Sequence, residues 1–79
     1  MHTTSNLLLR QHLAPLLRQE RLNRNLTPSQ IAIVCDLSAD TIERIENGLG
    51  VSIRKYIHLL RYYHKEIKIE LVDYDQAAA

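Results

Sequence analysis

Apolar residues recur at helical spacing on both sides of a short polar turn in the middle of the chain. Ile31, Ala32 and Cys35 fall on one helical face before the turn, and Ile42 and Ile45 lie three residues apart after it. The pattern predicts two short amphipathic helices joined by a tight turn. The polar face of the second helix is expected to point outward.

The residues at the ends of these two helices are typical helix caps. Thr27 is a favourable N-cap for the first helix, and Gln30 is placed to complete a capping box with it. Asp36 tolerates the left-handed backbone of a tight turn, and Ser38 can cap the second helix. The Asn-Gly pair at 47–48 is a typical end signal. The turn therefore lies between residues that favour it locally.

Leucines follow a helical spacing between about residues 7 and 22, after a polar stretch at residues 1–5 that we interpret as a disordered end. Pro15 falls inside this pattern, where a proline removes a hydrogen bond and clashes with the preceding turn. We therefore expect the first helix proper to begin near Ala14, with the earlier leucines forming an N-terminal extension. The alternative is one long helix kinked at Pro15. Residues 21–25 resemble an insertion that lengthens this helix or the following loop.

A fourth helix is predicted after Ser52, which is a suitable N-cap. Its apolar residues form one stripe that we expect to face the core. The predicted stripe consists of Ile53, Tyr56, Ile57, Leu60 and Tyr63.

After the fourth helix the pattern changes from helical to alternating. Ile67, Ile69 and Leu71 alternate with charged residues, which is typical of a half-buried strand. A lone strand cannot satisfy its own backbone groups, and the pattern predicts no second strand elsewhere in the chain. We therefore expect these three residues to form a dimerisation strand that pairs antiparallel with the same strand of a second copy.

The composition describes one small domain with an aliphatic core. The chain has 79 residues, 46% of them hydrophobic, with four tyrosines and no Phe or Trp. A domain of this size is marginally stable and often gains stability by dimerising. A single cysteine excludes an internal disulfide and favours a reducing, cytoplasmic setting. No apolar run reaches the roughly 20 residues of a membrane span, so we expect no membrane partner.

The residues around the turn resemble the helix-turn-helix of the Cro/CI (XRE) repressor family. The resemblance covers about residues 12–64, and its most specific part is the run TIERIENG at 41–48. It implies a mainly α, lambda-repressor-like domain of four to five helices over residues 1–65, with the motif at 27–48. To this we add the predicted C-terminal dimerisation strand and tail at 66–79. The resemblance implies a prokaryotic transcriptional repressor that binds double-stranded DNA as a homodimer.

In this family the second helix of the motif enters the DNA major groove. Matching the motif residue by residue predicts eight DNA-binding residues: Thr27, Ser38, Ala39, Asp40, Thr41, Glu43, Arg44 and Asn47. Arg44 suits a bidentate pair with guanine, and Asp40 can accept from a cytosine amino group. Pro28 stands where the family has a phosphate-binding glutamine, which removes one contact. The resemblance further implies an ion pair between Arg18 and Glu46.

The charge of the second helix argues for an alternative. Asp40, Glu43 and Glu46 oppose the single Arg44, and carboxylates are repelled by phosphate. The net charge of the chain is only +1. A protein-interaction module that kept the fold and lost DNA binding would explain both facts, with Ile33 as a candidate partner surface. Basic residues that could offset the acidity flank the motif: Arg10, Arg18, Arg21, Arg24, Arg54 and Lys55.

The alternating segment also looks like that of the HipB-type antitoxins, whose C-terminal strands pair across a dimer. Those proteins bind the DNA of their own operon and a HipA-type kinase toxin, so a toxin partner is a narrower hypothesis. The four histidines share no metal-ligand spacing, and the only glycines, Gly48 and Gly50, form no phosphate-binding loop. We expect no enzyme activity, cofactor or metal.

Overall fold

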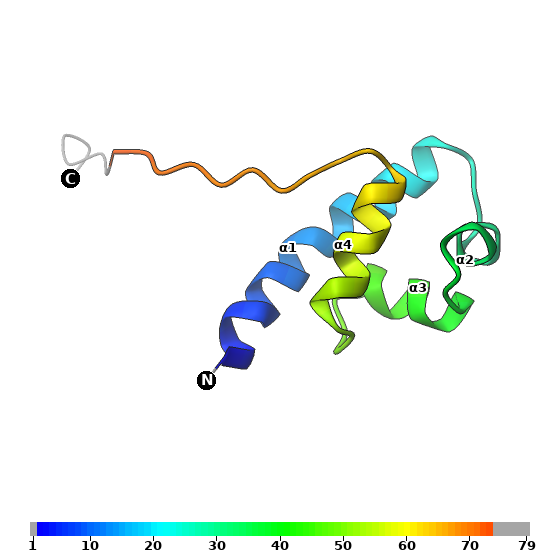
Figure 1. The fold of residues 1–79 in the computed structure, drawn as a ribbon, viewed down its shortest axis with the longest axis horizontal. Coiled ribbons are helices and arrows are strands. Elements are labelled where there is room, and N and C mark those ends of the chain that lie inside the picture. Colours follow the sequence, from blue (N-terminus) through cyan, green and yellow to red (C-terminus); the bar gives the residue numbers. More distant parts are fainter. Residues whose placement is uncertain (1, 74–79) are drawn as a thin grey trace.

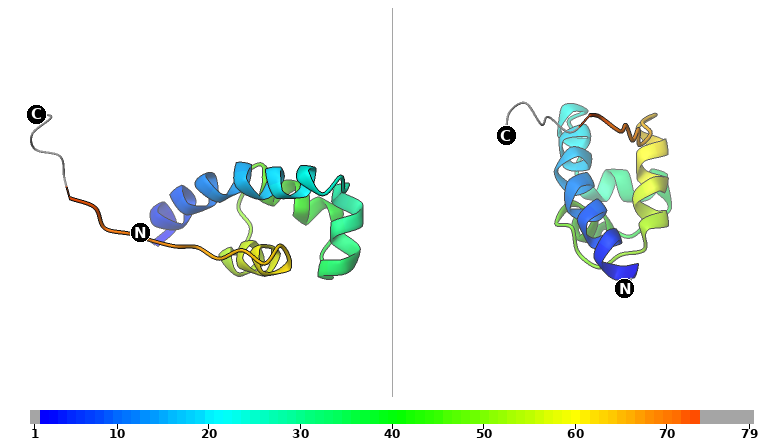
Figure 2. Two further views of the ribbon diagram at one scale, coloured as in Figure 1. Left: turned by 90° about the horizontal axis from the view of Figure 1, so that it is seen from above. Right: turned by 90° about the vertical axis from the view of Figure 1, so that its left-hand side faces the viewer.

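Helices dominate the part of the chain that the structure describes (Figure 1). The computed structural model describes the backbone of residues 2–73 and the side chains of residues 7–73. In this range the helices are α1 (His2–Asn23), α2 (Pro28–Cys35), α3 (Ala39–Glu46) and α4 (Ile53–Tyr62). α1 packs on both α3 and α4, and α2 crosses the end of the molecule where α1 stops (Figure 2). The expected mainly α fold is confirmed.

The first helix is continuous through Pro15, so the expected start near Ala14 is wrong. Residues 2–5 also belong to this helix, which corrects their interpretation as a disordered end. Leu13 and Leu17 are buried on either side of the exposed Pro15. Proline deprives only one carbonyl, four residues earlier, of its helical donor. Burial of the leucine stripe outweighs that local cost, and the helix curves without breaking (Figure 2).

The ends of α2 and α3 form as the sequence predicts. The backbone N–H of Thr27 donates to Gln30 Oε1 at 2.8 Å, and the N–H of Gln30 donates to Thr27 Oγ1 at 3.2 Å. Asp36 has a left-handed φ of 58°, and Ser38 Oγ accepts the N–H of the third residue of α3 at 3.0 Å. Gly48 ends the motif with a φ of 70°, a conformation that glycine adopts without strain. These confirmed caps set the angle between α2 and α3.

The core lies where the four helices meet. Its fully buried side chains are Leu17, Ile31, Ile42, Ile45, Tyr56, Leu59 and Tyr63. The stripe on α4 is shifted from the prediction, because Leu59 is buried whereas Ile53 and Ile57 are only half-buried. At 100° per residue, positions 56, 59, 60 and 63 centre on one line, and positions 53 and 57 lie at its edge.

Two side chains fasten α4 to neighbouring helices. Arg24 donates to the carbonyl oxygen of Tyr63 at 3.3 Å, and its guanidinium carbon lies 4.6 Å from the centroid of the Tyr63 ring. The Nε2 atom of His58 lies 2.7 Å from the carbonyl oxygen of Cys35 at the end of α2. These contacts hold α2 and the end of α1 against α4, so the helix-turn-helix has a rigid support.

The segment after α4 extends away from the helices (Figures 1 and 2). Residues 65–73 have no strand partner within the described chain. Ile67 packs against the core, whereas Ile69 and Leu71 are 83% and 98% exposed. A strand needs a second strand, and the structure contains one copy only. The predicted pairing between two copies therefore stays a prediction.

Candidate nucleic-acid interface

α3 presents one buried face and one open face. Ile42 and Ile45 are fully buried beneath the helix, whereas Asp40, Glu43 and Arg44 are exposed on the opposite side. A helix of eight residues is too short to be stable in isolation, so α3 depends on the packing of these two core residues. The arrangement leaves a short polar ridge free to contact a ligand.

Seven of the eight predicted DNA-contacting residues lie together on α3 and its caps, between residues 38 and 47. Ala39 and Thr41 are half-buried there, and Ser38 and Asn47 are exposed at the two ends. Thr27 is the exception, because it caps α2. The structure therefore brings seven predicted site residues onto one surface and leaves the eighth on a different helix.

The polar end residues of this surface are already partly engaged. The hydroxyls of Ser38 and Thr41 lie 2.8 Å apart, and Ser38 also caps α3. The Asn47 side-chain amide donates to the carbonyl oxygen of Glu43 at 2.8 Å. A hydroxyl or amide keeps capacity for a further bond, so these groups can still meet a phosphate. Their primary role in the fold is to shape the ends of α3.

The ion pair behind α3 is formed by Arg21, and the prediction of Arg18 is wrong. Arg21 Nε donates to Glu46 Oε2 at 2.7 Å and Arg21 Nη2 donates to Glu46 Oε1 at 2.9 Å, a bidentate pair. Arg21 also donates to the carbonyl oxygen of Leu26. Arg21 follows the buried Leu17 by four residues and so shares its helical face, whereas Arg18 lies about 100° away in solvent. Hydrogen bonding to Glu46 raises the pKa of Arg21.

The same pair changes the charge of the open face. The Glu46 side chain is only 6% exposed and is neutralised by Arg21, so it does not contribute an outward charge. The exposed charges of α3 are therefore two carboxylates, Asp40 and Glu43, against Arg44. The face is less acidic than the sequence indicated.

Five of the six flanking basic residues divide into two groups, and the sixth, Arg10, is half-buried. Arg21 and Arg24 are engaged within the fold, Arg24 through Glu20 and Tyr63. Arg18, Arg54 and Lys55 are exposed. Arg54 and Lys55 are the second and third residues of α4, in the first turn after its cap, Ser52, so they lie at a positive helix end. The sequence pattern did not reveal which arginines are structural, because Arg21 lies four residues after Leu17 and Arg18 lies four residues after Ala14, and both Leu17 and Ala14 are buried.

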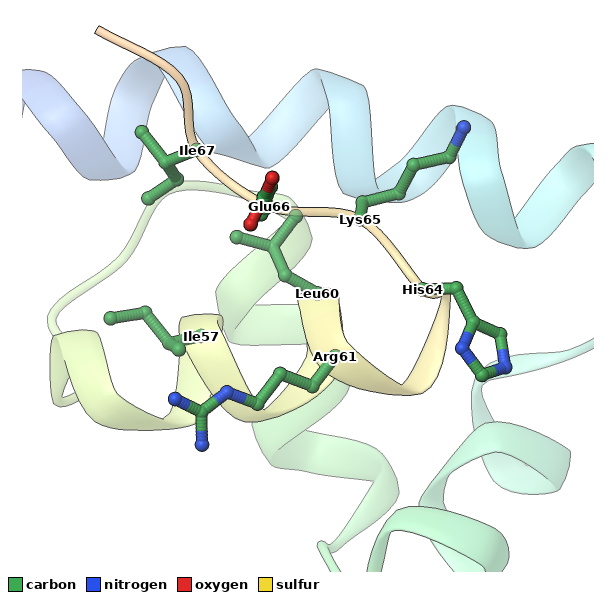
Figure 3. Close-up of a pocket in the computed structure, with 7 residues that line it drawn as sticks. All are labelled: Ile57, Leu60, Arg61, His64, Lys65, Glu66 and Ile67. Atoms are coloured by element: carbon green, nitrogen blue, oxygen red, sulfur yellow. The ribbon is translucent and has the colours of Figure 1, made fainter.

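Two further surfaces of the described chain lie outside α3. Ile33 on α2 is 81% exposed beside the exposed Val34, as expected for a candidate partner surface. A shallow groove runs between the end of α4 and the segment that follows it (Figure 3). Its lining is mixed: Ile57, Leu60, Arg61, His64, Lys65, Glu66 and Ile67. Sequence reasoning did not predict this groove.

Two other kinds of feature are absent from the described residues. No cluster of three or more His, Cys, Asp or Glu side chains within residues 2–73 could hold a metal ion. In the same range no helix is both long and apolar enough to cross a membrane.

Comparison with known proteins identifies a family for this arrangement of helices. Residues 12–64 match a family model described as a helix-turn-helix domain. The match covers the second half of α1 together with α2, α3 and α4. A comparison with curated proteins finds no match.

Proposed function

This chain belongs to the helix-turn-helix domain family, and from that premise we propose that it is a DNA-binding transcriptional regulator whose α3 enters the major groove. The observation that carries the proposal is the anchoring of α3. Ile42, Ile45 and the Arg21–Glu46 pair hold its inner face, and its outer face is polar and open.

The exposed side chains have distinct roles in this proposal. Arg44 pairs with the O6 and N7 atoms of a guanine, and Asp40 accepts a hydrogen bond from a cytosine amino group. Ser38, Thr41 and Asn47 contact phosphates or neighbouring bases. Exposed basic residues, Arg54 and Lys55 among them, supply the attraction to the backbone that fixes the protein on the duplex.

We further propose that the regulator is a homodimeric repressor of a palindromic operator. Two copies related by a twofold axis present two α3 helices to half-sites about 34 Å apart, one turn of DNA. The exposed apolar residues of 66–72 supply the contact between copies. A single domain would bind its half-site far more weakly than the dimer binds the operator.

Arg44 is the sharpest point at which to test the proposal. On an operator selected from random duplexes, Arg44→Ala is expected to reduce binding by about 1–3 kcal/mol and to relax the preference at one base pair. Arg61→Ala is the matched control, because it removes an exposed arginine from α4. Electrophoretic mobility shifts measure both variants. Equal losses, or no loss with Arg44→Ala, would refute the assigned role.

A second candidate function is a protein-interaction module that retains the fold and has lost DNA binding. The exposed Ile33 and Val34 favour it, as do the two outward carboxylates of α3. Mobility shifts of a random duplex between about 50 and 200 mM salt separate the two functions. The regulator loses affinity steeply as counterions compete for phosphate, whereas the interaction module shifts no duplex at any salt concentration.

Within the regulator, the similarity of 66–72 to the strand of HipB-type antitoxins supports a narrower proposal. Here the second partner is a HipA-type kinase toxin. A kinase-like gene beside this one, whose product co-purifies with the chain, supports it. A neighbourhood without such a gene leaves a stand-alone regulator.

A further inference from the structure

The segment after α4 carries its charges in a pattern that selects one way of pairing with itself. Lys68 Nζ lies 3.0 Å from Glu70 Oε2, so these two charges share one face of the extended segment. Ile69 and Leu71 are almost fully exposed, with no cover in the described chain. The segment thus offers alternating apolar and charged positions to a partner strand.

Two identical strands that pair antiparallel obey a simple geometric rule. A twofold axis at one residue places that residue opposite its own counterpart in the second copy. Every other residue lies opposite the residue of the second copy that is equally far on the other side of the axis, and side chains directly opposite one another share a face. An axis between residues would set apolar side chains against charged ones, because a one-residue shift exchanges the faces. The axis must therefore pass through a residue.

We propose that two copies of this chain pair over residues 65–73 about a twofold axis through Ile69; this register rests on the dimer of the proposed function. Each Ile69 then faces its own copy, and each Ile67 faces Leu71 of the second copy. All three apolar residues stay on one face, and nine residues of each chain join the ladder.

The charges complement one another in this register. Each Lys68 faces Glu70 of the second copy, and the two residues form a cluster of four alternating charges around the axis. Each Lys65, whose Nζ lies 3.7 Å from Glu20 Oε2 of its own chain, also faces Asp73 of the second copy. Glu66 faces Val72 of the second copy and has no charged residue directly opposite it. By symmetry the register contains four opposite-charge pairs and no like-charge pair, and directly opposite charges of unlike sign stabilise a sheet. This self-complementarity identifies a second copy as the occupant.

The neighbouring axes on the polar face are unfavourable. An axis through Lys68 sets Lys68 against its own copy and Glu66 against Glu70, which gives three like-charge contacts. An axis through Glu70 sets Glu70 against itself. Like charges directly opposite one another destabilise a sheet, so both registers are disfavoured.

An axis through Leu71 sets Ile69 against Asp73, an apolar residue against a charge. The remaining competitor is an axis through Ile67. It pairs Glu66 with Lys68, but it places Ile69 opposite Lys65 and sets Leu71 against Tyr63. Tyr63 is 1% exposed within the fold and is unavailable for a ladder. That register would leave the most exposed apolar residues of the segment uncovered.

The helices offer a seat for the apolar face of this ribbon. Ile67 lies with Leu13, Leu16 and Leu60 in a groove between α1 and α4. Ile67 and Leu60 also line the neighbouring groove shown in Figure 3. Leu71 of the second copy, opposite Ile67 and on the same face, falls about 5 Å from it. Leu16 is 61% exposed in the single chain and becomes covered. The ribbon and the helical groove thus form one continuous apolar contact.

Disulfide cross-linking tests the axis directly. In the full chain with Cys35→Ala, Ile69→Cys should give a covalent dimer when oxidised glutathione is added. Leu71→Cys is the matched control, since both positions are exposed. In the proposed register two Leu71 positions are four residues apart along the ribbon, about 13 Å, which is beyond disulfide reach. Cross-linking at Leu71, or at Ile67, in place of Ile69 overturns the register.

Charge reversal provides an independent test. Lys68→Glu and Glu70→Lys each create two like-charge contacts and should each weaken the homodimer about tenfold. Mixing the two variants restores opposite charges in a heterodimer, and the double variant restores them in a homodimer. Failure of both rescues overturns the register.

Sedimentation of the unaltered chain separates this inference from the proposed function. A dimer that fails the cross-linking and rescue tests refutes the register only. A chain that stays monomeric at micromolar concentration refutes the dimer of the proposed function, and the register with it.

Discussion

The carboxylate of Glu46 lies almost out of solvent at the junction of α1 and α3, where Arg21 holds it with two hydrogen bonds. Removing one partner of a buried pair strands the other charge, which costs up to roughly 3–5 kcal/mol. We therefore expect Glu46→Ala to lower the free energy of unfolding far more than Glu43→Ala, whose effect stays within about 0.5 kcal/mol. Urea unfolding measures both. Equal midpoints would show that the pair does not stabilise the fold.

The hydroxyl of Tyr63 is buried with no hydrogen-bond partner in the described chain, whereas Tyr56 donates to the carbonyl oxygen of Leu49 at 3.0 Å. At pH 7 we expect Tyr63→Phe to leave the unfolding free energy unchanged or higher, because it removes an unsatisfied group. Tyr56→Phe is the matched control and should cost about 1 kcal/mol. A larger loss from Tyr63→Phe would indicate a bond to its hydroxyl.

The dependence of stability on alkaline pH provides a second test of Tyr63. Burial raises the pKa of Tyr63 to about 12. The folded state favours the neutral hydroxyl of Tyr63. The contribution of this group to the free energy of unfolding is therefore complete below the pKa of about 10 that tyrosine has in the unfolded chain, and it is lost as the pH rises through about 12. The decline of unfolding free energy across this window should be shallower in Tyr63→Phe than in the parent chain. Identical slopes would contradict the raised pKa.

At the scale of elements, α1 accommodates a proline in its interior. Alanine is favoured over proline inside a helix by about 3 kcal/mol. Proline also restricts the unfolded chain, and losing this restriction lowers the free energy of unfolding by roughly 0.4–1 kcal/mol. Because Pro15 is exposed, its replacement disturbs no core contact. We expect Pro15→Ala to raise the free energy of unfolding by about 2–2.6 kcal/mol, measured by urea unfolding. His12→Ala, at another exposed site of α1, should change it by only a few tenths of a kcal/mol. A destabilised Pro15→Ala would mean that the fold requires the curvature.

At the scale of the whole molecule, the helices form a self-contained core, and among residues 65–73 only Ile67 contributes to it. We expect a chain ended at Lys65 to keep its helix content by circular dichroism and to sediment as a monomer that has lost tight operator binding. The full chain with Ile33→Ser is the control, because it removes an exposed apolar residue of α2 and should remain dimeric. A truncated chain that still dimerises would place the interface on the helices.

The helix-turn-helix was predictable because its determinants are local. Thr27 and Gln30 cap each other three residues apart, Asp36 adopts the left-handed turn by itself, and Ser38 bonds within the first turn of α3. The outward position of Arg44 follows equally from the spacing of the buried residues of α3. Interactions within one helical turn depend on neighbours that the sequence lists in order.

The predictions that were wrong concern contacts between elements that are distant in the sequence. Arg18 and Arg21 are equivalent candidates by charge, and only the rotation of α1 against α3 selects Arg21 for Glu46. The continuity of α1 through Pro15 likewise depends on leucines that are buried by other helices, a gain that no local propensity contains.

The sequence by itself therefore determined the caps, the turn and the outward face of α3, because their energies arise within a few residues. Tertiary structure alone decided which arginine neutralises Glu46, and hence how acidic the open face is. It also decided that Leu59 enters the core, with Ile53 and Ile57 left at its edge. Burial and ion pairing between helices depend on how whole elements rotate and pack, and that arrangement exists only when all of them are in place.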